Sequence, residues 1–94
     1  MCLLSLGENG AMLVRKDGIL KANIPSIPVV NPVGSGDSMI AGMTYSIYND
    51  FGLEEGLRMA CACGMANAME EKTGFVQSQI IKQLLNEIHI TSID

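Results

Sequence analysis

Residues 31–43 read NPVGSGDSMIAGM, and this stretch decides how the chain is interpreted. Gly34 and Gly36 stand directly before a run whose apolar residues have helical spacing. Glycines allow successive backbone amides to turn toward one point, and the positive end of a helix dipole would lie at the same place. The stretch therefore predicts an anion-binding turn at the N-terminus of a helix.

Asp37 follows that turn at once. A carboxylate there is well placed to accept the proton of an alcohol that attacks a phosphoryl group, while the amides stabilise the developing charge. The alternative is a plain flexible turn with Asp37 as an N-cap, a role that suits Asp, and short glycine motifs often arise by chance. Gly42 permits close helix packing, which either a nucleotide-binding helix or an ordinary core contact explains. The residues alone leave both interpretations open.

The rest of the chain predicts strands first and helices afterwards. Apolar runs at 2–6, 11–15 and 19–24, separated by glycine-containing turns, predict three short strands. Three prolines between residues 25 and 32 predict an extended connection to Gly34. Helical spacing then predicts helices over 37–50, 53–72 and 78–87, and residues 88–93 are expected to form a last strand.

The first two helices carry different apolar patterns. The first has two apolar stripes and is therefore expected to be buried on two sides: Ile40, Met43, Thr44, Ile47 and Phe51 form one stripe, and Ala41, Tyr45 and Tyr48 form the other. The second is expected to bury one face, formed by Leu57, Ala60, Cys61, Gly64, Met65 and Ala68. A pair between Glu54 and Arg58 is expected on its other side.

The composition indicates one small folded domain. The chain has 94 residues, of which 48% are hydrophobic and 17% are charged. The hydrophobic fraction is too high for a disordered tail, and it is high for so small a domain. Part of the apolar surface is therefore expected to pack against further polypeptide.

Charge and cysteine content exclude several classes of protein. The formal net charge is -4 and the six basic residues are scattered, which argues against a nucleic-acid partner. Cys2, Cys61 and Cys63 lack the spacing of a zinc site and are interpreted as small buried thiols in a reducing compartment. With neither a membrane-spanning run nor a signal peptide in the sequence, we expect a cytoplasmic protein.

The motif at 31–43 is similar to the second signature of the PfkB/ribokinase family of carbohydrate kinases, in which a GSGD or GAGD turn precedes a long helix. SLGENGA at 5–11 resembles the strand and turn that lie along the nucleotide, and ACGMANA at 62–68 resembles the helix that approaches the adenine. The resemblance implies an α/β fold: the C-terminal part of a ribokinase-like sandwich, with short N-terminal strands followed by three helices. Residues 1–94 would be about the last third of such a domain, whose complete form has a mostly parallel sheet.

The same resemblance implies roles for individual residues. Asp37 would be the catalytic base, with Gly34, Ser35 and Gly36 as the anion hole. Ser5, Gly7, Gly10 and Gly36 would contact the nucleotide phosphates and ribose, and Asn67 the adenine side. The implied cofactors are ATP and Mg²⁺, but the family's acidic magnesium motif has no counterpart here and no metal ligand is assigned.

Within the family, two segments are most similar to those of kinases that convert tagatose 6-phosphate into tagatose 1,6-bisphosphate in lactose degradation. They are Asn31 and Pro32 before GSGDS, and EEKTGFV at 70–76. The nearest alternative is a 1-phosphofructokinase fragment. The family's sugar site and β-stranded lid are missing, so we expect the chain alone to be inactive or nearly so, and the N-terminal portion of the kinase to be a candidate partner. Two other hypotheses stay open: a non-catalytic nucleotide- or anion-binding remnant, and a degraded reading frame whose product aggregates.

Overall fold

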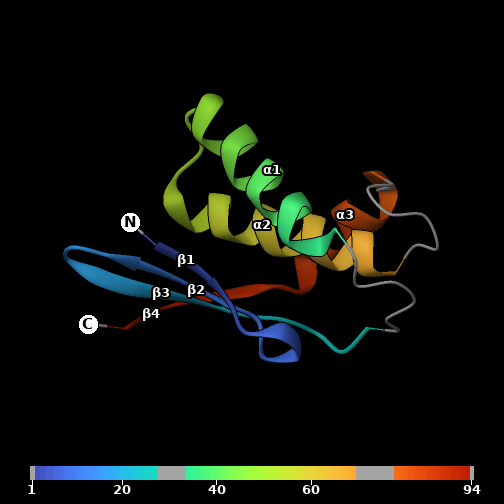
Figure 1. Cartoon of the computed structure of the whole chain (residues 1–94), viewed down its shortest axis with the longest axis horizontal. Coiled ribbons are helices and arrows are strands. Elements are labelled where there is room, and N and C mark those ends of the chain that lie inside the picture. The colour runs from blue at the N-terminus through green and yellow to red at the C-terminus, as the bar shows by residue number, and fades with distance from the viewer. Residues whose placement is uncertain (1, 28–33, 70–77, 94) are drawn as a thin grey trace.

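The computed structural model describes residues 2–27, 34–69 and 78–93 of the chain. Its strands are β1 (Cys2–Ser5), β2 (Ala11–Arg15), β3 (Gly18–Asn23) and β4 (His89–Ile93), and its helices are α1 (Ser35–Tyr48), α2 (Leu53–Ala68) and α3 (Ser78–Glu87), with a short 3-10 turn at Gly7–Asn9. The helices gather on one side of the sheet, and α2 lies between the sheet and α1 (Figure 1). This order of elements confirms the predicted α/β arrangement.

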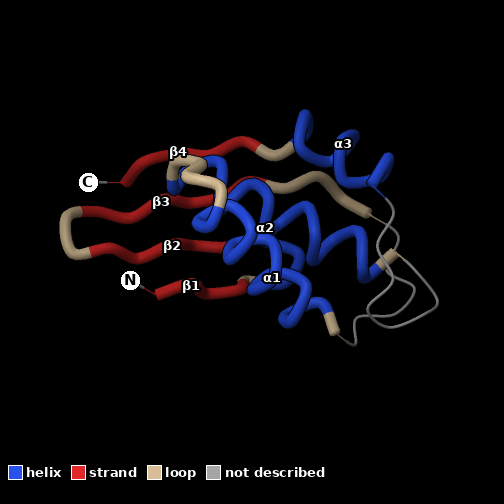
Figure 2. Tube along the Cα trace, turned by 90° about the horizontal axis from the view of Figure 1, so that it is seen from above, coloured by secondary structure: helices blue, strands red, loops and turns tan. Residues whose placement is uncertain are grey.

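The four strands form one sheet in the order β1-β2-β3-β4, and every pairing is antiparallel. Seen from above, the strands lie side by side and both chain ends are at the same end of the sheet (Figure 2). The mostly parallel sheet expected of the complete fold is therefore not found among the described residues. Both β1 and β4 are edge strands in this sheet.

Alternate side chains of β2 and β3 point toward the helices and form one side of the core. Leu13 pairs with Leu20 and Ala11 with Ala22, and all four side chains are buried against the helices. The predicted face of α2 is confirmed, because each of its six members is buried. With the sheet on one side and α1 on the other, even Ala62 and Ala66 of α2 have almost no exposed surface. α2 is thus the central helix of the molecule.

The expected burial of α1 on two sides is wrong. Its buried residues are Met39, Gly42, Met43 and Ser46, whereas most members of the two predicted stripes face outward. Gly42 allows a close contact between this side of α1 and α2. A Cβ on Gly42 would lie 2.9 Å from the Met59 carbonyl oxygen and 3.1 Å from the Ala60 Cα. The absence of a side chain at Gly42 lets α1 approach α2 this closely at that point.

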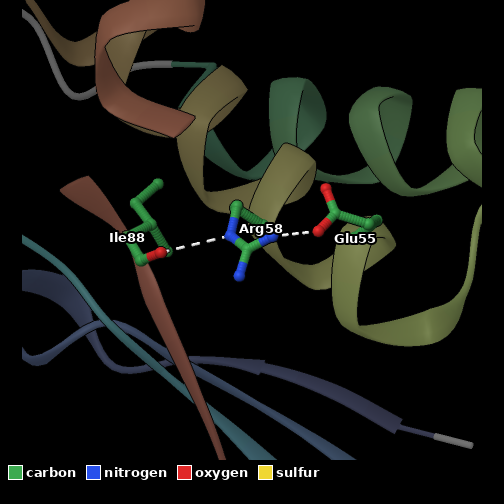
Figure 3. Close-up of polar contacts among 3 residues, drawn as sticks. All are labelled: Glu55, Arg58 and Ile88. Carbon is green, nitrogen blue, oxygen red and sulfur yellow. Dashed lines mark hydrogen bonds and ion pairs between the residues drawn. The ribbon is translucent and has the colours of Figure 1, made fainter. Parts of the chain in front are cut away.

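Arg58 pairs differently from the prediction. Its guanidinium forms an ion pair with Glu55 rather than Glu54, and its Nε donates a hydrogen bond of 3.1 Å to the carbonyl oxygen of Ile88 (Figure 3). Three- and four-residue spacings both bring helical side chains together, so the local pattern did not distinguish the two carboxylates. The contact with Ile88 ties α2 to the start of β4. In the described parts of the chain, no helix is long and apolar enough to cross a membrane.

Candidate nucleotide-binding site

A cavity of about 400 Å³ opens where four segments meet: the β1–β2 turn, the segment after β3, the start of α1 and the later half of α2. Its volume is in the range of small-molecule and cofactor sites. Polar and small residues come from the turn and from α1, and the remaining wall is largely apolar. The lining residues are Ser5, Gly7, Gly10, Ile24, Pro25, Ser26, Ile27, Ser35, Met39, Cys61, Gly64, Met65 and Ala68.

The β1–β2 turn is held tightly against β3. The Leu6 amide donates to the Gly10 carbonyl oxygen at 2.8 Å, and Lys21 Nζ donates to the Asn9 carbonyl oxygen at 3.0 Å. Gly10 has a φ of 95°, and a Cβ there would lie 2.1 Å from the Ala22 carbonyl oxygen. Only glycine meets both conditions, so the turn brings bare backbone to the edge of the cavity.

The start of α1 has the geometry of an anion-binding helix terminus. Gly34 is the N-cap in the left-handed conformation, with a φ of 86°, and its carbonyl oxygen accepts from the Ser38 amide at 3.0 Å. No side chain caps the helix, so the N-cap alternative for Asp37 is wrong. The first amides of a helix have no intrahelical acceptor. Those of Ser35, Gly36 and Asp37 therefore have no acceptor within α1, and they lie beside the carboxylate of Asp37.

The predicted site residues fall into two groups. Ser5, Gly7, Gly10 and Ser35 lie together around the cavity, whereas Gly34, Gly36, Asp37 and Asn67 do not line it. Asp37 and Gly36 are exposed in the first turn of α1. Their position leaves them accessible to a substrate that approaches the helix terminus from outside the cavity.

Asn67, for which the resemblance implies an adenine-side contact, does not line the cavity. Its side chain is fully buried, and its Nδ2 donates to Ser35 Oγ over 3.5 Å, a long hydrogen bond. It therefore connects α2 to the first residue of α1. A contact between Asn67 and a nucleotide stays a prediction.

Sequence reasoning missed most of the cavity wall. The sequence predicts Ile24 as the end of a strand, residues 25–27 as an extended connection, and the side chains of α2 as core. Met39 and Gly64 show why the wall is compact: a Cβ on Gly64 would lie 2.5 Å from Met39 Cγ and 3.3 Å from the Ser35 carbonyl oxygen. Apolar wall residues carry no motif. A glycine on the buried face of a helix was the one signal that could have pointed to them. Asn31, Pro32 and the EEKTGFV segment lie outside the described residues.

The described ranges contain no group of three His, Cys, Asp or Glu side chains that could hold a metal ion. All three cysteines are free, but the expectation that all are buried is wrong, because Cys2 is exposed and Cys63 is half-buried. Burial raises the pKa of the Cys61 thiol to about 12, an effect that the charge of Lys21 partly offsets. Cys61 is therefore a neutral thiol in the cavity wall at physiological pH, not a thiolate nucleophile.

This pKa makes stability depend on pH in alkaline solution. Between pH 9.0 and about 12, the folded chain keeps the Cys61 proton that the unfolded chain has lost. Over that window we expect the free energy of unfolding to fall by about 1.4 kcal/mol per pH unit, with the full stability retained below pH 9.0. Urea unfolding of the wild type and of Cys61→Ala at several pH values measures this. Equal slopes in the two proteins would contradict the assignment.

Comparison with known proteins identifies the family. The model of the pfkB family carbohydrate kinases matches residues 1–80. The chain belongs to the pfkB family. Tagatose-6-phosphate kinase of Staphylococcus epidermidis is 40% identical over 91 residues, which are 97% of this chain and 29% of that enzyme. The chain thus spans less than a third of the length of this pfkB relative.

Solved structures show the same fold. A crystal structure of a Staphylococcus aureus protein provisionally named phosphofructokinase superposes with a TM-score of 0.92 and 36% identity, over 98% of this chain and 29% of that one. Phosphofructokinase-2 of Escherichia coli, in complex with substrates and products, gives a TM-score of 0.81 and 27% identity, over 89% of this chain and 27% of its own. Ribokinase of Arabidopsis thaliana superposes with a TM-score of 0.78 and 24% identity, over 88% of this chain and 28% of its own, which confirms the ribokinase-like fold class.

Proposed function

We propose that this chain is the nucleotide-binding and catalytic portion of an ATP-dependent sugar-phosphate kinase that converts tagatose 6-phosphate into tagatose 1,6-bisphosphate. The observation that supports this most directly is the cavity itself: backbone of the β1–β2 turn and the N-terminus of α1 meet beside a largely apolar wall. A nucleotide-binding site combines backbone amides, which bind the phosphates, with an apolar slot for the nucleobase. The 40% identity with a tagatose-6-phosphate kinase supports the substrate.

In the proposed reaction, Asp37 accepts the proton of the sugar hydroxyl as its oxygen attacks the γ-phosphorus of ATP. The bond from that phosphorus to the bridging oxygen breaks, and ADP leaves. The free amides at Ser35 and Gly36 stabilise the charge on the transferred phosphoryl oxygens. The described residues do not fit a protein-bound Mg²⁺ site, since they offer no cluster of ligands. Magnesium would therefore arrive on the phosphates of ATP.

The alternatives differ in substrate or in chemistry. A 1-phosphofructokinase fragment would use the same cavity and the same base, and the provisional phosphofructokinase name of the Staphylococcus aureus structure favours it. A non-catalytic remnant would keep nucleotide binding without transfer. Assays with each sugar phosphate distinguish the three when this chain replaces the matched residues of a complete kinase, since a non-catalytic remnant would transfer nothing even there.

The first experiment measures phosphoryl transfer from MgATP by the purified chain, with ATP binding followed in parallel. We expect binding but almost no turnover, because the chain lacks the parts that would position a sugar, and such positioning contributes about 7 to 11 kcal/mol in well-oriented systems. Full turnover with tagatose 6-phosphate, abolished by Asp37→Ala, would contradict the expected inactivity. Neither binding nor turnover would contradict the proposed site and favour the degraded product.

A matched pair of variants tests whether ATP binds in the cavity. Ser5 lines the cavity, whereas its neighbour Leu4 is 45% exposed and does not line it. Adjacent strand residues point to opposite faces of a sheet. We expect Ser5→Trp to weaken ATP binding at least tenfold and Leu4→Trp to leave it unchanged, as measured by titration calorimetry. Equal affinities in the two variants would place the nucleotide elsewhere.

A further inference from the structure

Asn67 stands out among the buried residues of α2. Every other buried position of this helix holds glycine, alanine, cysteine, leucine or methionine, and the side chain of Asn67 is fully buried. Burying a carboxamide costs free energy unless its polar atoms find hydrogen-bond partners. An alanine at this position would avoid that cost, so the contacts of Asn67 indicate what the carboxamide contributes.

The carboxamide of Asn67 reaches the start of α1. Its Nδ2 donates to Ser35 Oγ over 3.5 Å, and Ser35 is the first residue of that helix. Ser35 lines the cavity, whereas Asn67 does not. The hydrogen bond therefore links a buried residue behind the cavity wall to a residue of the wall itself.

A second contact from α2 reaches the same residue. A Cβ on Gly64 would lie 3.3 Å from the Ser35 carbonyl oxygen, so the bare backbone of α2 lies close to the backbone of Ser35. Gly64 and Asn67 are three residues apart and share one side of α2. The end of α2 lies beside the start of α1 (Figure 1). α2 thus contacts both the main chain and the side chain of Ser35.

The start of α1 has no anchor within its own helix. Its N-cap is Gly34, and no side-chain hydrogen bond caps it among the described residues. The first turn is closed by the Ser38 amide, which donates to the Gly34 carbonyl oxygen at 3.0 Å. A capping side chain would normally hold such a turn in place. Here the contact with Asn67 holds it from the neighbouring helix.

We propose that Asn67 is a positioning residue for the phosphoryl transfer: through Ser35 it fixes the first turn of α1, whose amides stabilise the transferred phosphoryl group. This inference rests on the proposed function. Amides stabilise developing charge only while they keep the geometry of the transition state, and a displacement of about 1 Å can lower a rate about 10²-fold. Asn67 therefore acts on kcat rather than on the affinity for ATP.

The test uses a chimaera in which this chain replaces the 91 matched residues of Staphylococcus epidermidis tagatose-6-phosphate kinase. Asn67→Leu removes the carboxamide and keeps much of its volume, Ser35→Ala removes the hydroxyl, and a double variant removes both. Ser46→Ala is the matched control, because Ser46 is a fully buried serine of α1 whose Oγ has no hydrogen-bond partner in the described structure. Thermal unfolding shows that each variant is folded.

Two measurements follow each variant. We expect Asn67→Leu and Ser35→Ala each to lower kcat about tenfold or more, with the KM for ATP within about threefold of the parent. The double variant should lose no more than the larger single loss, because both substitutions break the same contact. By NMR, hydrogen exchange of the Ser38 amide should be about tenfold faster in all three. Ser46→Ala should match the parent in both measurements.

Three results would overturn the proposal. Parent kcat in Asn67→Leu would mean that the contact does not serve the reaction, even with faster exchange. Losses that multiply in the double variant would mean that Asn67 and Ser35 act independently. A raised KM for ATP in Asn67→Leu alone would mean that Asn67 contacts the nucleotide.

Failure of the proposed function gives a different result. A folded parent chimaera without kinase activity would contradict the proposed reaction, whereas the exchange of the Ser38 amide does not depend on activity. In that case faster exchange in Asn67→Leu would still support the anchoring of α1 through Ser35, and unchanged exchange would overturn it.

Discussion

Replacing Asp37 by Asn should lower kcat by a factor of about 10² to 10⁴, the usual contribution of a general base. The experiment uses a chimaera in which this chain replaces the 91 matched residues of Staphylococcus epidermidis tagatose-6-phosphate kinase, because the missing parts are then present. Asn has nearly the shape of Asp but cannot take the proton of the sugar hydroxyl. Since Asp37 is exposed and does not line the cavity, ATP affinity should change little.

Asp50 provides the control for this substitution. It is also an exposed aspartate, but it lies beyond the C-terminal end of α1, far along the helix from Asp37. Asp50→Asn should keep the kcat of the parent chimaera. If Asp37→Asn kept it as well, or lowered only the affinity for ATP, Asp37 would not be the base.

Gly10→Ala should cost about 3 kcal/mol or more of the free energy of unfolding. The added Cβ would lie 2.1 Å from the Ala22 carbonyl oxygen, a distance that only a shift of β3 or of the turn can relieve. The φ of 95° adds backbone strain for any residue with a side chain. Since a domain of this size is stable by only about 5 to 15 kcal/mol, a large fraction of its stability would be lost.

Gly7→Ala separates the backbone strain from the steric contact with Ala22. Gly7 also has a positive φ, of 60°, but a Cβ there would have no heavy atom within 4 Å. Only the cost of the left-handed conformation applies, about 1 to 2 kcal/mol. Urea unfolding of both variants measures the difference. Equal losses would mean that the turn relaxes away from Ala22, and that it is not held as tightly as its hydrogen bonds indicate.

The positions of the elements were predictable because the signals are local. The predicted helix at 78–87 and strand at 11–15 have the same bounds in the structure, since amphipathic periodicity and turn glycines act within a few residues. The resemblance of the motifs at 5–11 and 31–43 to those of the family named four residues that line the cavity: Ser5, Gly7, Gly10 and Ser35. The ion-pair partner of Arg58 could not be predicted, because Glu54 and Glu55 both stand at a spacing that brings helical side chains together.

The sequence by itself determined which segments are strands and helices, and that a glycine turn precedes α1, because these depend on residues close together in the chain. Only the tertiary structure decided which side of α1 is buried and which residues enclose the cavity. Both depend on how closely distant segments approach: Gly42 lets α1 press against α2, and Gly64 leaves room for Met39 beside Ser35. Apolar periodicity indicates that a helix face is suited to burial. Whether that face is buried depends on what packs against it, and the side chains of Ile40, Ile47 and Tyr48 stay exposed in the described part of this chain.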